Sequence, residues 1–210
     1  APAMSASQAA ELLSRDLPTG SLIFSQGDCL AVKVFTASRY THVGAIVERE
    51  GRHQVYESTG GAGVRKQNLE EFLASQGGAS ACVYRPQNKF TEEQQARFER
   101  HLDSELGRPY AIAHHLTGRR CEGLHCAEYA TDALVAANVL TAEHPPRVSP
   151  ASLKTGIERS ELYREVATLQ LEPVAPRQPE DAGWCSRMWF DTKLCTRNCY
   201  RKLRGWFCCK

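Results

Sequence analysis

The stretch that decides the fold is Cys121-Glu-Gly-Leu-His-Cys-Ala-Glu-Tyr-Ala-Thr-Asp-Ala-Leu134, in which a turn containing Gly123 leads into a helix that begins at Cys126. Small and apolar residues recur close to the helical period at Ala127, Ala130, Ala133, Leu134, Ala137 and Leu140. Three of these alanines follow on nearly the same face as Cys126, so the helix can approach a neighbouring sheet closely. The pattern therefore predicts that Cys126 lies in a first helical turn, at the edge of a sheet.

A cysteine in the first turn of a helix is a candidate nucleophile. The unpaired backbone N–H groups and the positive end of the helix dipole favour a thiolate, which lowers the thiol pKa. The same N–H groups can hold an oxyanion. A structural role is the alternative for Cys126, either in a disulfide, with Cys121 for example, or as a buried inert thiol.

A nucleophilic cysteine needs a base, and His42 is the best placed of the seven histidines. It opens the apolar run His42–Glu48, which is long enough for a buried strand. The next strand is predicted over Gln54–Ser58, after a turn containing Gly51, so the two are expected to form an antiparallel hairpin. Glu57 can then lie near His42, where a carboxylate orients the imidazole and stabilises its charged form.

Four patches of sequence resemble the circularly permuted branch of the NlpC-type papain-like cysteine hydrolases, which includes YiiX-like proteins and lecithin:retinol acyltransferase-like enzymes. The patches are Leu17–Phe24, Thr41–Val47, Val55–Ser58 with Gly63-Val64, and Leu106–Tyr110 leading to His125–Glu128. They cover roughly 17–157, and the histidine precedes the cysteine, as in that branch. The resemblance implies Cys126 as nucleophile, His42 as base and Glu57 as third polar residue. The chain departs from the usual pattern at Ser21, Ala111 and Ala127.

The predicted fold is α+β and papain-like, with a small antiparallel sheet or half-barrel packed on the Cys126 helix. The domain is expected over 1–171, followed by a Pro-rich linker over 172–183 and a Cys-rich tail over 184–210. Further helices are predicted over 6–16, 69–76, 91–107 and from Ser149, and further strands over 21–24, 31–35, 81–85 and 163–171. Residues 36–41 are interpreted as a loop at the rim of the cleft.

The tail differs in composition from the rest of the chain. It holds five of the nine cysteines, all three tryptophans, and seven Lys or Arg against one Asp. We expect either a cationic aromatic surface that contacts an anionic membrane, cell-wall polymer or partner, or a disulfide-tied extension that wraps the body. Zinc held by Cys195, Cys199, Cys208 and Cys209 is a further alternative, against which the irregular spacing of these cysteines argues.

Nine cysteines favour an exported protein, secreted or periplasmic, because eight remain for four disulfides if Cys126 is free. A net charge of +2 argues against nucleic acid as a partner. The sequence predicts no cofactor. Histidines and cysteines are dense over 114–126, but without the paired spacing of zinc sites, so no metal is expected. The side chain of His125 is expected to point away from the sulfur, in a rim or packing role.

The predicted activity is that of a cysteine hydrolase that works through a thiolate and an acyl-enzyme. The wider resemblance implies an amidase or peptidase acting on peptides of bacterial cell-wall peptidoglycan. The permuted branch implies, as an alternative, hydrolysis or transfer of phospholipid acyl esters, which the cationic tail favours. A non-catalytic module, whose cleft only holds a ligand, is the alternative from another class of protein.

Overall fold

The computed structural model describes residues 3–26, 40–111 and 122–173. Its centre is a six-stranded sheet with the order β4-β3-β2-β1-β5-β6, in which every neighbouring pair is antiparallel. The strands are β1 (Leu22–Ser25), β2 (His42–Arg49), β3 (Arg52–Thr59), β4 (Gly63–Asn68), β5 (Ser80–Pro86) and β6 (Tyr163–Gln170). The predicted α+β class is confirmed, and the sheet is open.

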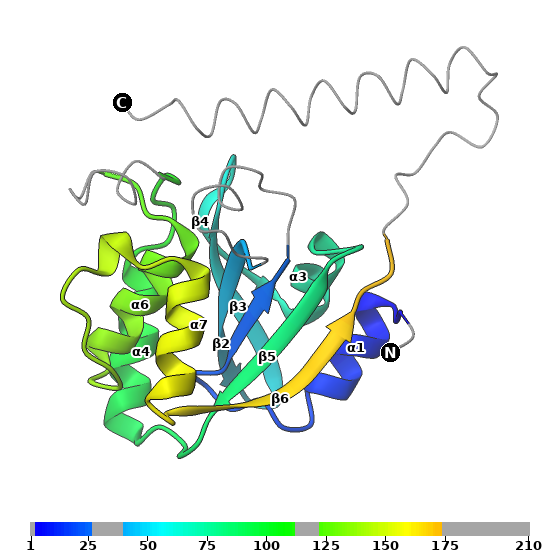
Figure 1. Cartoon of the computed structure of the whole chain (residues 1–210), viewed down its shortest axis with the longest axis horizontal. Coiled ribbons are helices and arrows are strands. Elements are labelled where there is room, and N and C mark those ends of the chain that lie inside the picture. The colour runs from blue at the N-terminus through cyan, green and yellow to red at the C-terminus, as the bar shows by residue number, and fades with distance from the viewer. Residues whose placement is uncertain (1–2, 27–39, 112–121, 174–210) are drawn as a thin grey trace, which may run out of the picture.

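Helices cover both faces of this sheet (Figure 1). They are α1 (Ala6–Leu13), α3 (Leu69–Ser75), α4 (Glu92–Ser104), α6 (Cys126–Ala136), the 3-10 helix η1 (Pro145–Arg147) and α7 (Pro150–Arg159). Leu22 and Phe24 of β1 join the core with α4, α6 and α7, whereas Ile23 joins a second core with α1 and α3. The sheet therefore lies between two apolar layers, and its side chains alternate between them.

The elements that bear on the site are placed as predicted. β2 and β3 form the expected antiparallel hairpin, and α6 begins at Cys126. The helix expected over 91–107 has its predicted capping box at Thr91 but ends at Ser104. Sequence reasoning missed β4 as a separate strand, because its polar residues show no alternation with apolar ones.

Several predictions fall outside the described residues. They are the strand over 31–35, most of the rim loop over 36–41, the linker apart from its first two residues, and the whole tail. Among the helices of 3–26, 40–111 and 122–173, none has the length and apolar character that crossing a membrane requires.

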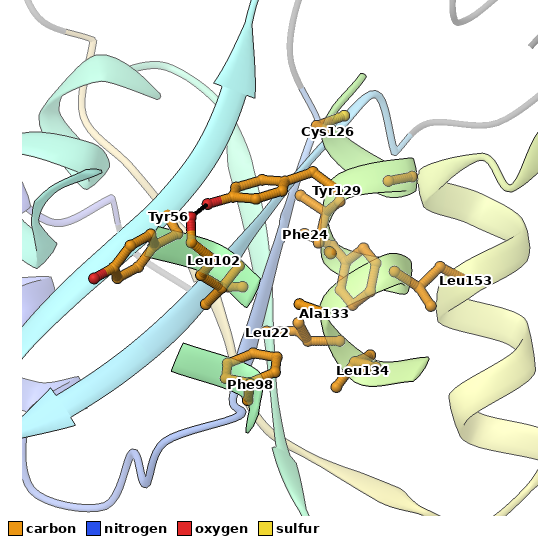
Figure 2. Close-up of a cluster of buried hydrophobic side chains, with 14 of the residues drawn as sticks. Leu22, Phe24, Tyr56, Phe98, Leu102, Cys126, Tyr129, Ala133, Leu134 and Leu153 are labelled. Atoms are coloured by element: carbon orange, nitrogen blue, oxygen red, sulfur yellow. Dashed lines mark hydrogen bonds between the residues drawn. The ribbon is translucent and has the colours of Figure 1, made fainter. Parts of the chain in front are cut away.

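Helix α6 packs closely on the sheet because its inner face carries small residues. Ala130, Ala133 and Ala137 are buried, and the helix contacts β2 and β3. Figure 2 shows Ala133 facing Leu22 and Phe24 of β1. Larger side chains at the alanine positions would push the helix away from the sheet. The predicted close approach of this helix is confirmed.

The turn before Cys126 is held from two sides. The hydroxyl of Ser58, on β3, donates to the carbonyl of Leu124 at 2.7 Å, and the Leu124 N–H donates to the carbonyl of Pro109 at 2.9 Å. A Cβ at Gly123 would lie 2.6 Å from the Ala111 Cβ and 2.7 Å from the Pro109 oxygen. Only glycine fits at position 123 without a clash. Together with the hydrogen bond from Ser58, this close contact fixes the start of α6 relative to β3.

We expect Gly123→Ala to destabilise the protein by about 1–3 kcal/mol, because the added methyl group forces the turn away from Pro109 and Ala111. Gly156→Ala is the matched control, since a Cβ there meets nothing within 4 Å. It lies in α7 and should stabilise by up to about 1 kcal/mol through helix propensity. Urea denaturation measures both changes, and equal stability of the two variants would contradict the role of Gly123.

Candidate active site

His42 is anchored at the start of β2 by a buried carboxylate and a ring. Its Nε2 lies 2.5 Å from Oε2 of Glu57, whose side chain is 1% exposed. The ring of Phe72 stacks on the imidazole, with 6.0 Å between centroids and 24° between planes. These contacts leave Nδ1 as the nitrogen available to another partner. The predicted proximity of Glu57 to His42 is therefore confirmed.

Glu57 has partners on both of its oxygens. Arg65, opposite it in the β3–β4 pairing, donates from Nε to Oε1 at 2.8 Å, and the Gln67 amide donates to the same oxygen at 2.8 Å. Burial by itself raises the pKa of Glu57, but the hydrogen bond and charge of His42, followed by those of Arg65, bring it below its usual value. Glu57 is therefore a carboxylate at neutral pH.

Arg65 and Gln67 were missed by sequence reasoning because β4 was not recognised as a strand. The signal is their spacing: residues two apart on a strand point to one face, and the β3–β4 pairing puts that face beside Glu57. Recognising the turn at Gly61 and Gly63, both with positive φ, would have predicted the pairing.

Cys126 completes the cluster as the first residue of α6. It is a free thiol and 5% exposed. Burial by itself raises its pKa, whereas hydrogen bonds with His125 and His42, and then their charges, lower it to about 6. Burial likewise lowers the pKa of His42, but the hydrogen bond with Cys126, and then the contacts with Glu57, raise it to about 10. A thiolate and an imidazolium therefore coexist between these two values.

His125 does not point away from the sulfur, so that prediction is wrong. It is the N-cap residue of α6, and its ring interacts with Cys126. Nδ1 accepts from the backbone N–H of Glu128 at 3.3 Å, and Nε2 lies 3.0 Å from the carbonyl oxygen of Pro146. The imidazole therefore turns back toward its own helix and caps the third N–H group.

The described cysteines correct two expectations. Cys126 is free, which overturns the alternative of a structural disulfide at this position. Cys82 is also a free, buried thiol, with the hydroxyl oxygens of Tyr40 at 3.1 Å and Thr168 at 3.3 Å from its sulfur. Eight cysteines are therefore not left over for four disulfides.

No group of three or more His, Cys, Asp or Glu in 3–26, 40–111 and 122–173 is arranged to hold a metal ion. His114, His115 and Cys121, part of the dense stretch in the sequence, lie outside those ranges, as do the four tail cysteines considered for zinc.

The shifted pKa of Cys126 predicts its reactivity. Alkylation by iodoacetamide, followed for each cysteine by peptide mass spectrometry, should reach half its maximal rate near pH 6. An ordinary thiol reaches half its maximal rate at about pH 8.5. His42→Gln should move the midpoint toward the ordinary value, because it removes the imidazolium. Cys82 is an internal control that should react more slowly, and a midpoint for Cys126 near that of an ordinary thiol would contradict the ion pair.

Comparison with known proteins identifies the family to which this chain belongs. A model described as a permuted papain-like amidase enzyme of the YaeF/YiiX, C92 family matches residues 16–144. No curated protein matches. Among solved structures, the chain is similar to one described as metalloprotein yiiX from Escherichia coli O157:H7, with 21% identity, a TM-score of 0.49, and coverage of 78% of this chain and 99% of that one. The family model spans more than half of the chain, including His42, Glu57 and Cys126, and the protein therefore belongs to the permuted papain-like amidases.

Proposed function

We propose that this amidase is a cysteine hydrolase in which Cys126 is the nucleophile, His42 the general base and acid, and Glu57 the group that orients His42. The observation that carries the proposal is the position of the His42 ring, which has a buried carboxylate on Nε2 and interacts with the Cys126 thiol. Nucleophile, base and orienting acid are the three parts that covalent acyl transfer needs.

The groups support a two-step reaction. The Cys126 thiolate attacks the carbonyl carbon of an amide, and the imidazolium of His42 gives its proton to the departing amine nitrogen as the C–N bond breaks. The acyl group is then a thioester on Cys126. His42, now neutral, takes a proton from water, whose oxygen attacks the thioester and releases the acid. Thiolate and imidazolium are restored, so the proton count balances.

The oxyanion of each tetrahedral intermediate needs donors beside the sulfur. The backbone N–H groups of Cys126 and Ala127 are the first two of α6, and no acceptor within the described ranges bonds them. The third, of Glu128, is already bonded to His125. The helix dipole adds to the attraction for negative charge. We therefore assign the two free N–H groups to the oxyanion.

Peptides of bacterial cell-wall peptidoglycan are the substrate class we propose. Amide hydrolysis is the chemistry of the family, and cross-linked wall peptides are amides that an exported enzyme meets. The exported location is part of this proposal and rests on the seven cysteines other than the free Cys82 and Cys126, a high number for a reducing compartment.

Phospholipid acyl esters are the second candidate, and one observation favours them. The tail over 184–210 carries seven Lys or Arg against one Asp, together with three tryptophans. Such a segment suits an anionic lipid surface, where cations meet headgroups and indoles sit at the interface. A thiolate that cleaves amides also cleaves esters, so the chemistry does not separate the two.

Variants test the assigned roles. Cys126→Ala should lower kcat/KM by at least about 10³-fold, because no other group can form the thioester. His42→Ala should do the same. Glu57→Gln keeps an oxygen for the hydrogen bond but removes the charge, so a loss of about 10–100-fold is expected. Circular dichroism should show a native fold in all three. Turnover by Cys126→Ala would disprove the mechanism, and Cys126 that labels as an ordinary thiol would favour a binding module.

Product analysis separates the substrates. The protein is incubated with muropeptides or with anionic phospholipid vesicles, and mass spectrometry identifies products, with Cys126→Ala as control. We expect new peptide fragments that the variant does not form. Lysolipid and free fatty acid, formed only with Cys126 present, would instead assign the enzyme to lipids. Deletion of 184–210 should then abolish both vesicle binding and lipid cleavage.

A further inference from the structure

The helix that carries the nucleophile has an unusual N-cap. The described helices α1, α3, α4 and α7 are capped by Ser5, Asn68, Thr91 and Ser149, whose short side chains accept from the third N–H of the helix. These are the residue types that generally cap helices. In α6 the capping group is an imidazole instead, because Nδ1 of His125 accepts from the Glu128 N–H.

The second ring nitrogen of His125 makes a contact that a short capping side chain cannot reach. Nε2 lies 3.0 Å from the carbonyl oxygen of Pro146, which belongs to η1 and is 21 residues further along the chain. The ring is buried, as is the carboxylate of Glu128, whose Oε2 is 3.8 Å from Nε2. The imidazole thus ties the start of α6 to the segment that leads into α7.

The two contacts define the roles of the nitrogens. Nδ1 must carry a lone pair to accept from a backbone N–H, and Nε2 must carry the hydrogen to donate to a carbonyl. In this tautomer both nitrogens are engaged. Burial by itself lowers the pKa of His125, but its ring also interacts with the Cys126 sulfur, which raises that pKa above its usual value. The Nδ1 of His42, in contrast, is not held by Glu57.

We propose that His125 is a positioning residue of the active site: it fixes the first turn of α6 so that the Cys126 sulfur faces His42 and the N–H groups of Cys126 and Ala127 stay free for the oxyanion. The inference rests on the proposed function, because it concerns the same nucleophile. A cap that bonded the first or second N–H would remove a donor from the oxyanion site. The cap on the third N–H stabilises the helix end without that loss.

Two variants separate capping from the imidazole itself. His125→Asn keeps an oxygen that reaches the Glu128 N–H but gives up the Pro146 contact, and His125→Ala gives up both. We expect kcat of His125→Ala to fall by at least about tenfold with a smaller change in KM, because the sulfur and the oxyanion donors shift relative to the carbonyl. His125→Asn should recover most of this loss.

Two readouts need no substrate. Hydrogen exchange of the Glu128 amide should be faster in His125→Ala than in the original protein and should slow again in His125→Asn. The pH midpoint of Cys126 alkylation should rise in His125→Asn, because the hydrogen bond of His125 also lowers the pKa of Cys126, but it should stay below that of an ordinary thiol, because His42 still interacts with the sulfur. A midpoint shifted to that of an ordinary thiol would overturn the proposal, because the imidazole would then act on the sulfur by charge.

Steady-state kinetics can also overturn the proposal that His125 positions the nucleophile. Full kcat in His125→Ala, or a kcat of His125→Asn no better than that of His125→Ala, would show that capping does not position the nucleophile. If His125→Ala does not fold, His125→Asn decides alone: a kcat within about threefold of the original protein supports the proposal, and a loss of about tenfold or more overturns it. Cys126→Ala is measured beside them: turnover by that variant defeats the proposed function, whereas an inactive Cys126→Ala with a fully active His125→Ala defeats only this inference.

Discussion

The contact between α6 and the sheet is the constraint on which the site depends. Cys126 and His42 are 84 positions apart, and their interaction requires the start of the helix to lie at the start of β2. Buried alanines at 130, 133 and 137 allow the helix axis to approach, and Ser58 and Gly123 fix the turn before it. Protein interiors are closely packed, so these small residues fix the helix position within narrow limits.

The charges of the site alternate in sign. Arg65, Glu57, His42 and Cys126 follow one another as cation, anion, cation and anion. A single charge placed in this buried setting would be costly, but each charge here has a neighbour of opposite sign. The low local polarity that makes isolated charges unfavourable also strengthens their attraction in the series. Arg65 is 40% exposed and connects this line of charges to solvent.

The segment matched by the amidase family ends at 144, before the last part of the structure. Pro146, α7 and β6 lie beyond it, yet they belong to the body: β6 pairs with β5, and Leu153 and Ile157 of α7 share the core with α6. The contact of His125 with Pro146 therefore joins the nucleophile helix to a part of the chain outside the family match. The matched segment and the part of the chain after it therefore share one sheet and one core.

The sequence by itself determined the local elements: the α6 start at Cys126, the β2–β3 hairpin, the caps at Thr91 and Ser149, and the residue types needed for acyl transfer. These follow from periodicity and end signals, which act over a few residues. Only the tertiary structure decided that Arg65 and Gln67 hold Glu57, that His125 turns back to reach Pro146, and that Cys82 is a free thiol. Arg65 and Gln67 are near Glu57 in the chain but reach it only through the β3–β4 register, and the contacts of His125 and Cys82 join residues at least 21 positions apart. Strand register and helix packing decide all of these contacts, and the periodicity of side chains does not encode them.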